Sequence, residues 1–253
     1  YLDEDDDIPA MMAKVKEALE ELKPFTDLGA CTFAESETED KDWINNWKQY
    51  FKPFTVDHIL IKPTWEEIPE EHKDKLLIQI DPGTAFGTGK HETTQLCIRQ
   101  LEKYVKPGVK VLDLGTGSGI LGIAALKLGA EYVFGTDLDE NAITAVHENL
   151  AANDIPEEKF GVIQGNIIDD KATQDAAGYE CYDIVVANIL ADVIIPIAGI
   201  VDRFLKPGGV FISSGIIYMK EEEVKDAINN NSNLQLSKVV NQGDWRAIMA
   251  IKK

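Results

Sequence analysis

The sequence predicts an α/β fold in which a mainly parallel sheet carries helices on both faces. Its clearest sign is a short apolar strand, Val111–Leu114, that runs into alternating glycines and then into an apolar helix, Ile120–Leu128. This order of strand, turn and helix begins open parallel sheets. Strands and helices then alternate regularly. Two final strands, Leu234–Val240 and Trp245–Ile251, are separated by a short polar turn, which is a hairpin signal.

The N-terminal residues 1–39 predict part of a small α+β domain. Residues 9–22 place apolar side chains on one helical face, and Pro24 ends that helix. Residues Gly29–Ala34 predict a strand. One helix and one or two strands are too little for an independent core, so the beginning of this domain is expected to be missing.

Residues 40–56 are predicted to form a linker helix. Four aromatic side chains recur there at helical spacing: Trp43, Trp47, Tyr50 and Phe51. Such a stripe is more often a packing face than a binding site. Residues 57–253 are predicted to be the large α/β domain, which begins with strands at His58–Ile61 and Leu76–Ile80.

A glycine-rich loop is predicted for Asp81–Thr94, ahead of a helix that runs to about Tyr104. Two interpretations of this loop remain open. It is either a plain turn in which Thr93 or Thr94 caps the helix, or a loop that folds over a ligand and presents Thr94 to it. His91 is expected to be a surface or packing histidine.

The glycine turn itself indicates what the sheet binds. Glycines stand at 115, 117 and 119, whereas the dinucleotide fingerprint G-x-G-x-x-G needs its third glycine at Ile120. Asp113, just ahead of the turn, would repel a pyrophosphate and suits a cationic group such as an α-amino group. The turn therefore favours a ligand without a pyrophosphate, and glycines let it approach the backbone.

The next strand, Tyr132–Thr136, ends in Asp137, about 20 residues after the glycines, where an acid accepts hydrogen bonds from ribose hydroxyls. An amino group and a ribose without a pyrophosphate describe S-adenosylmethionine, whose product is S-adenosylhomocysteine. The alternative is that Asp113 and Asp137 only stabilise turns and helix caps.

The rest of the chain continues the alternation of strands and helices. The predicted strands are Phe160–Ile163, Tyr182–Ala187 and Val210–Ser213, and the predicted helices are Glu140–Asn153, Val193–Leu205 and Lys220–Asn229. Asn166 and Asn188 follow two of these strands, and the segment 206–209 is expected to stop a helix. A parallel sheet closed by an antiparallel hairpin is the Rossmann-like layout of seven-stranded methyltransferases.

Composition limits the partners. The formal net charge of -19 argues against a direct nucleic-acid partner. It permits a basic protein partner, and the alternative, equally weighted, is that the charge serves solubility alone. The three cysteines, Cys31, Cys97 and Cys181, lie far apart, so neither a disulfide framework nor a metal site is expected. The longest apolar tract, 184–201, contains Asn188, Asp192 and Pro196 and does not predict a membrane span.

From Asp81 onward the chain resembles the ribosomal protein L-eleven methyltransferases, the PrmA family. The motifs that carry the resemblance are DPGTAFGTGKHETT (81–94), LDLGTGSGIL (112–121), GTDLD (135–139) and ANIL (187–190). The resemblance implies cofactor contacts at positions matching Thr94, Gly115, Asp137 and Asn188. It also implies an N-terminal substrate-recognition domain of ferredoxin-like type. With Gly117 and Asn166, these four residues form the predicted cofactor site.

Asn188 is also the candidate catalytic residue, because its carbonyl oxygen can orient an acceptor amine; the alternative is a helix cap. Enzymes that methylate planar amides or bases often show Asn-Pro-Pro-Tyr here, whereas this chain has Asn-Ile-Leu. The expected activity is therefore methylation of amino groups, on lysine side chains or an N-terminal amine, of a basic large-subunit ribosomal protein by a cytoplasmic monomer. The alternatives are an RNA or small-molecule N-methyltransferase and, less favoured, a dinucleotide oxidoreductase or a silent binding module.

Overall fold

The chain divides into two compact units, residues 1–47 and 48–253. The structure, a computed structural model, describes residues 8–22, 51–81 and 89–253. In the first unit it describes helix α1, Ile8–Leu22, as expected. The predicted strand at 29–34 and residues 40–50 of the predicted linker helix lie outside the described residues.

The second unit is built on a seven-stranded sheet with the order β6-β5-β4-β7-β8-β10-β9. Its strands are β4 (Lys110–Leu114), β5 (Tyr132–Asp137), β6 (Phe160–Gln164), β7 (Tyr182–Asn188), β8 (Leu205–Ile217), β9 (Leu234–Gln242) and β10 (Trp245–Lys252). The strands from β6 to β8 run parallel, while β10 pairs antiparallel with both β8 and β9. The predicted parallel sheet with a terminal hairpin is confirmed.

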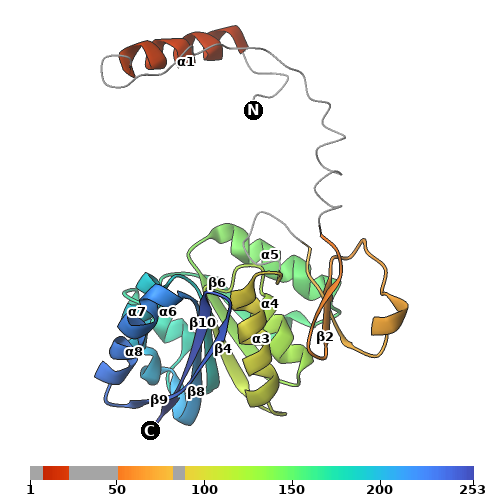
Figure 1. Ribbon diagram of the computed structural model, residues 1–253, viewed down its shortest axis with the longest axis vertical. Coiled ribbons are helices and arrows are strands. Elements are labelled where there is room, and N and C mark those ends of the chain that lie inside the picture. Colours follow the sequence, from red (N-terminus) through yellow and green to blue (C-terminus); the bar gives the residue numbers. More distant parts are fainter. Residues whose placement is uncertain (1–7, 23–50, 82–88) are drawn as a thin grey trace. The chain divides into compact units, whose positions relative to one another are not determined.

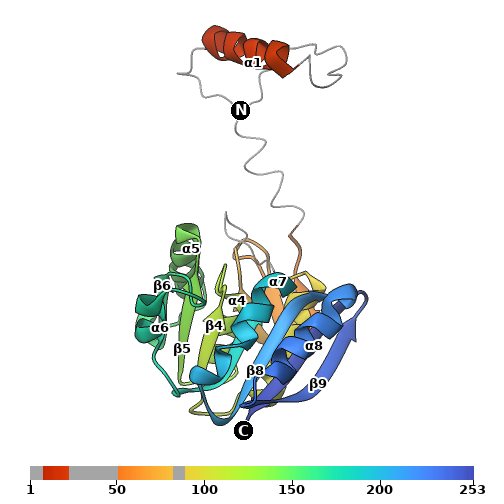
Figure 2. The same cartoon turned by 90° about the vertical axis from the view of Figure 1, so that its left-hand side faces the viewer.

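Helices cover both faces of this sheet (Figure 1). One face carries α3 (Glu92–Tyr104), α4 (Ile120–Lys127) and α5 (Glu140–Ala152), and the other carries α6 (Lys171–Ala177), α7 (Ala191–Ala198) and α8 (Glu221–Asn230). Figure 2 shows the second group in front of the strands. Each face has its own hydrophobic core, as expected for strands whose apolar side chains alternate between two helical layers.

The segment between α7 and β8 differs from the prediction. The predicted helix Val193–Leu205 ends at Ala198, is followed by a short 3-10 turn at Val201–Arg203, and its last residue begins β8. The segment 206–209, expected to stop a helix, lies inside β8, where the pairing with β7 shifts register. Gly208 has a φ of +77° there, so the glycine makes an irregularity of the strand instead of a helix end.

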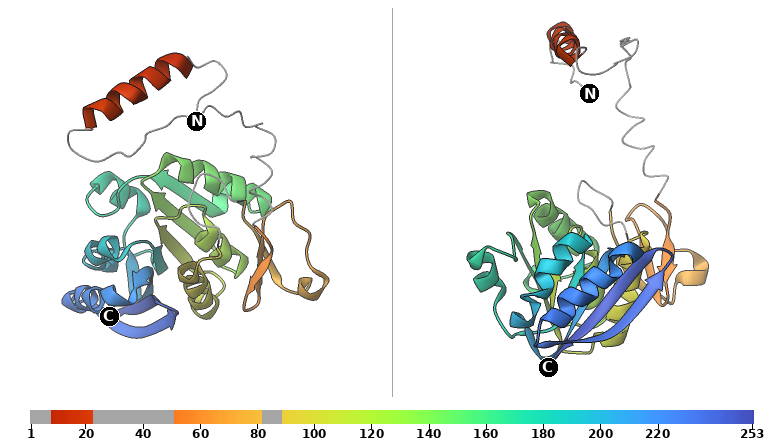
Figure 3. Two further views of the ribbon diagram at one scale, coloured as in Figure 1. Left: turned by 45° about the horizontal axis from the view of Figure 1, so that its top comes forward. Right: turned by 60° about the vertical axis from the view of Figure 1, so that its left-hand side comes forward.

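A second, three-stranded sheet consists of β1 (Phe54–Val56), β2 (Ile59–Lys62) and β3 (Leu76–Gln79). Strand β1 occupies the last residues of the predicted linker helix, so that end of the helix was placed wrongly. Three buried side chains of β2 and β3, those of Ile59, Ile61 and Ile78, share one core with α3 and α4. Figure 3 shows the small sheet beside these helices. The small sheet therefore extends the helical layer beside the main sheet.

None of the described helices is long and apolar enough to cross a membrane.

Candidate active site

The structure brings together two predicted site residues that are 94 positions apart. Asn188 is the last residue of β7, and Thr94 lies in the first turn of α3. The Asn188 Nδ2 donates a hydrogen bond of 3.0 Å to the Thr94 Oγ1. Because the amide nitrogen faces Thr94, the amide oxygen of Asn188 is directed away from it and can accept hydrogen bonds from another group.

The start of α3 is capped by His91, and not by Thr93 or Thr94 as in one of the two interpretations of this loop. The His91 Nδ1 accepts a hydrogen bond from the Thr93 backbone N, and the ring packs edge-on against Trp245 with 4.8 Å between the ring centroids. His91 is thus a packing histidine, as expected. With the cap supplied by His91, the Thr94 hydroxyl is left to bind Asn188.

The glycine turn after β4 is joined to the end of β5. The Asp137 Oδ2 accepts a hydrogen bond of 2.8 Å from the Gly117 backbone N, and the Asp137 Oδ1 accepts one of 3.0 Å from the Asp139 N. Gly115 and Gly117 have φ values of +68° and +53°, in the left-handed region that favours glycine. Each Asp137 oxygen has a further lone pair, so the carboxylate can still accept from a ligand.

Asp113 is buried and bonded within the turn, which matches the alternative that it stabilises a turn and not the expected contact with a cationic ligand group. Its side chain is only 1% exposed, and its Oδ2 accepts hydrogen bonds from the Thr116 Oγ1 and the Gly122 N at 2.9 and 3.0 Å. Burial raises the pKa of this carboxyl from 3.8 to about 7. Asp113 therefore ties strand β4 to the glycine turn and to the first turn of α4.

Ile189 connects the two halves of the site, which the sequence did not indicate. A Cβ on Gly115 would lie 2.6 Å from the Ile189 Cγ2, and one on Gly215 would lie 2.1 Å from the Ile189 carbonyl oxygen. The Ile189 N also donates to the Ser214 carbonyl oxygen at 3.1 Å. Ile189 therefore packs closely between the glycine turn and the end of β8. In the sequence, the only sign of this close approach is Gly215, because a glycine has no Cβ to clash with Ile189.

Asn166, the last predicted cofactor residue, follows β6 at the same edge. Its Oδ1 accepts a hydrogen bond from the Ile168 N at 3.0 Å. Its neighbour Gly165 donates its backbone N to the Asp137 carbonyl oxygen at 2.8 Å. The six predicted residues therefore gather at the carboxyl ends of β4, β5, β6 and β7, which is where ligands of open α/β sheets bind.

The residues at this edge fit S-adenosylmethionine. The glycine turn, with positive φ at Gly115, Gly117 and Gly119, presents backbone without a Cβ to a ligand. Asp137 offers a carboxylate suited to ribose hydroxyls. The Gly119 amide at the start of α4 donates to the Thr116 carbonyl oxygen at 2.9 Å, so it is already bonded within the turn and not available to a pyrophosphate.

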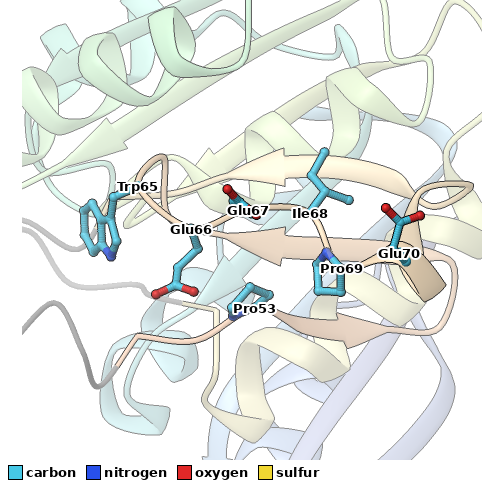
Figure 4. Close-up of a pocket in the computed structure, with 7 residues that line it drawn as sticks. All are labelled: Pro53, Trp65, Glu66, Glu67, Ile68, Pro69 and Glu70. Carbon is cyan, nitrogen blue, oxygen red and sulfur yellow. The ribbon is translucent and has the colours of Figure 1, made fainter.

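A cavity of about 520 Å³ lies elsewhere, on the loop between β2 and β3 (Figure 4). Three glutamates, Glu66, Glu67 and Glu70, line it beside Pro53 and Trp65, and none of the predicted site residues does. Glu66 is paired with Lys52 at 2.9 Å. Within the described part of the chain no cluster of His, Cys, Asp or Glu could hold a metal ion.

Comparison with known proteins agrees with this geometry. A family model described as "Ribosomal protein L11 methyltransferase (PrmA)" matches residues 1–253. A protein named ribosomal protein L11 methyltransferase from Lachnospira eligens is 55% identical over 253 residues, which are 100% of this chain and 80% of the relative.

Solved structures show the same fold. The crystal structure of ribosomal protein L11 methylase from Lactobacillus delbrueckii subsp. bulgaricus has a TM-score of 0.71 and 34% identity, and the match covers 80% of this chain and 100% of that one. A SAM-dependent methyltransferase from Aquifex aeolicus shares the fold alone, with a TM-score of 0.51 and 15% identity over 62% of this chain and 89% of that one. By sequence and by fold, the chain belongs to the ribosomal protein L11 methyltransferase family.

Proposed function

We propose that this chain transfers methyl groups from S-adenosylmethionine to amino groups of ribosomal protein L11, namely lysine side chains and an N-terminal amine. Methylation of that ribosomal protein is the activity for which the relatives are named. The observation that supports an amine acceptor is the hydrogen bond from the Asn188 Nδ2 to Thr94, because it leaves the Asn188 carbonyl oxygen available to accept from an amine.

The cofactor is assigned to the edge formed by Gly115, Gly117, Asp137, Asn166 and the Thr94–Asn188 pair. The bound cofactor supplies a methyl group on a sulfonium, which is already electrophilic. Asp137 accepts from the ribose hydroxyls, while its bonds to the Gly117 and Asp139 amides hold the carboxylate in place. The glycine turn lets the cofactor lie against the backbone.

The chain's task in the chemical step is to position the acceptor. Correct placement of two reactants supplies about 7–11 kcal/mol of a barrier. A lysine amine with a pKa of ~10.4 must first lose a proton, at a cost of about 4–5 kcal/mol at pH 7. The Asn188 oxygen accepts hydrogen bonds from the remaining N–H groups of the neutral amine. These bonds orient the lone pair of the amine nitrogen toward the methyl group of the cofactor. Asn188 acts as an orienting group and not as a base.

Methylation of RNA or of a small molecule is the alternative activity. Asn-Ile-Leu after β7 places no aromatic ring directly beside Asn188 on which a planar base could stack. The formal net charge of -19 opposes a phosphate backbone and complements a basic protein. A ribosomal-protein substrate also fits the expected cytoplasmic location. Methylation of this substrate does not require an oligomer, so we keep the expectation that the chain acts as a monomer.

The test is a methyl-transfer assay with isotopically labelled cofactor, in which purified ribosomal protein L11 and ribosomal RNA compete. We expect label on lysines of the protein, located by mass spectrometry of its peptides. Label on the RNA alone would favour the alternative. Calorimetry with NAD in place of S-adenosylmethionine tests for an oxidoreductase, and we expect no binding of NAD.

A further inference from the structure

Four exposed apolar side chains lie in the two segments that follow β7 and β8, the neighbouring strands in which Asn188 pairs with Ser214. We call Leu190, Val193, Tyr218 and Met219 the apolar collar. Nine large apolar side chains are exposed in the described part of the chain, and these are four of them; Leu190 is 71% exposed and Met219 is 65% exposed. Concentration of exposed apolar side chains at one place indicates a contact surface.

The two turns of the collar touch each other. Strands β7 and β8 are neighbours, with Asn188 opposite Ser214. Beyond them, the Lys220 Nζ lies 3.2 Å from the Asp192 Oδ1, which joins the turn after β8 to the start of α7. Because the collar begins two residues after Asn188, anything that reaches the Asn188 amide along this side passes over the collar.

The collar is held rigidly although its side chains are exposed. The Tyr218 backbone N donates to the Asp244 carbonyl oxygen at 2.8 Å, and Lys220 also pairs with Glu223 at 2.8 Å. The Ile189 N is bonded to the Ser214 carbonyl oxygen. A surface ordered before binding loses little conformational freedom when a partner docks.

Acidic side chains border the collar. Helix α8 begins with Glu221, Glu222 and Glu223, and Asp192 stands in the first turn of α7. The Asp192 and Glu222 side chains are 75% and 80% exposed, although Asp192 pairs with Lys220 and Glu222 pairs with Lys225. The four acids of this border face three cations, Lys220, Lys225 and Arg246, so the border keeps an excess of one negative charge. An apolar centre with an acidic border complements a polypeptide that carries apolar side chains among basic ones.

The geometry points to the apolar collar as the docking surface for the substrate segment that flanks the acceptor lysine. Apolar side chains of that segment pack on Leu190 and Met219, and its basic residues face Asp192 and Glu222. This inference rests on the proposed function and adds the place where the protein substrate, as distinct from the cofactor, is held. It also accounts for the large apolar side chains that remain exposed at the edge of the active site.

The experiment measures steady-state methylation of intact ribosomal protein L11 by the full chain and by Leu190→Ser, Met219→Ser and their double variant. Because both side chains are exposed, the variants should fold normally. Each removes apolar contact with the substrate, so we expect KM to rise about tenfold per substitution, with single-turnover rates at saturating substrate unchanged. Ile68→Ser is the matched control, since Ile68 is exposed on the loop between β2 and β3, and its KM should not change.

Calorimetry and sedimentation distinguish substrate docking from cofactor binding and from self-association. The affinity for S-adenosylmethionine should be the same in all variants; a parallel loss would assign the collar to the cofactor and overturn the inference. A wild-type dimer that the double variant dissociates would assign the collar to a second copy of the chain. If the collar variants are active and their KM for ribosomal protein L11 is unchanged, the docking inference is also overturned. If the wild-type chain does not methylate the ribosomal protein, the proposed function fails and the docking inference fails with it.

Discussion

At the residue scale, the site depends on side chains that fix one another before any ligand binds. Asn188 is oriented by Thr94, and Asp137 is oriented by two backbone amides. Groups held in this way lose little freedom when they bind, which is how a site gains both affinity and rate from position alone.

Replacing Asp137 by Ala should weaken binding of S-adenosylmethionine, because a charged hydrogen bond to the ribose is lost. A bond of this kind is worth roughly 1.5–3 kcal/mol. Titration calorimetry measures the change. Asp139→Ala is the control, because Asp139 caps α5 by accepting from the Asn141 N and should affect stability more than affinity. Unchanged affinity in Asp137→Ala would remove Asp137 from the cofactor site.

Asp113 should make the fold less stable as the pH rises. Burial raises the pKa of its carboxyl to about 7 in the folded chain, whereas an unfolded chain titrates near 3.9. Between these values the folded state binds the extra proton, so the free energy of unfolding falls as pH rises from about 4 to about 7. Above pH 7 the folded chain holds a charged, buried carboxylate.

Asp113→Asn should abolish this part of the pH dependence, because the amide oxygen can still accept from Thr116 and Gly122 but cannot ionise. Denaturant unfolding of both proteins at pH 5 and pH 8 is the measurement. The difference in unfolding free energy between the two pH values should be smaller in the variant. An equal difference in both proteins would mean that Asp113 titrates normally.

The sequence was sufficient to group the site residues but not to orient them. The positions of Thr94, Gly115, Asp137 and Asn188 follow from motifs and from the rule that parallel strands end at one edge. The residue pattern left two roles open for Asp113, a ligand contact and the stabilisation of a turn, and did not decide between them; its bonds to the Thr116 hydroxyl and the Gly122 amide match the second.

At the element scale, the strand–helix alternation was predictable where apolar runs are strong, as at β4, α4 and β7. Helix α6, Lys171–Ala177, was missed because it is short and polar and depends on the cap by Asp170, whose carboxylate accepts from the Ala172 and Thr173 amides. Strand β8 was predicted too short, because Pro207 and two glycines look like a helix stop, whereas its pairing with β7 continues past them.

The turn after β7 depends on Gly215 in the neighbouring strand β8. Its φ is +86°, and an added Cβ would lie 2.1 Å from the Ile189 carbonyl oxygen. Gly215→Ala should therefore displace the Asn188 turn and cost about 1–3 kcal/mol for the clash, beyond the roughly 1–2 kcal/mol for a left-handed residue. Methylation at saturating cofactor should fall with it.

The variant Gly208→Ala measures the cost of a left-handed φ for alanine without the steric clash that Gly215→Ala adds. Gly208 has a φ of +77°, but a Cβ there meets no atom within 4 Å. Its loss of stability should be the smaller of the two, and its methylation rate should match the wild type. Equal losses of stability and activity in both variants would show that the contact with Ile189 does not position the site.

At the scale of the whole molecule, the chain has two units, residues 1–47 and 48–253. Residues 48–253 contain both sheets and both hydrophobic cores, and all six predicted site residues belong to this unit. The family resemblance implies that the N-terminal residues 1–39 recognise the protein substrate, and the apolar collar is proposed as a second contact on the unit 48–253.

A chain limited to residues 48–253 should therefore keep a cooperative thermal transition and the full affinity for S-adenosylmethionine, because its cores and cofactor residues are intact. It should methylate ribosomal protein L11 with a much higher KM than the full chain. Calorimetry and steady-state kinetics test the two halves of this prediction. An unchanged KM would mean that residues 1–47 do not bind the substrate.

The proposed mechanism depends on Asn188, which is oriented by Thr94 and aims a neutral lysine amine at the methyl group. The most direct measurement is the pH profile of single-turnover methylation at saturating cofactor for the wild type, Asn188→Ala and Asn188→Asp. The wild-type rate should rise above pH 7 as the amine is deprotonated, and Asn188→Ala should be slower than its cofactor affinity explains. Asn188→Asp should be slow near neutral pH, because a carboxylate stabilises the charged amine, and should partly recover at high pH.

A flat wild-type profile between about pH 7 and pH 9.5, with chemistry rate-limiting, would contradict a lysine acceptor with the ordinary pKa of ~10.4. A rising profile that neither substitution changes would leave the lysine acceptor in place and exclude Asn188 from the mechanism.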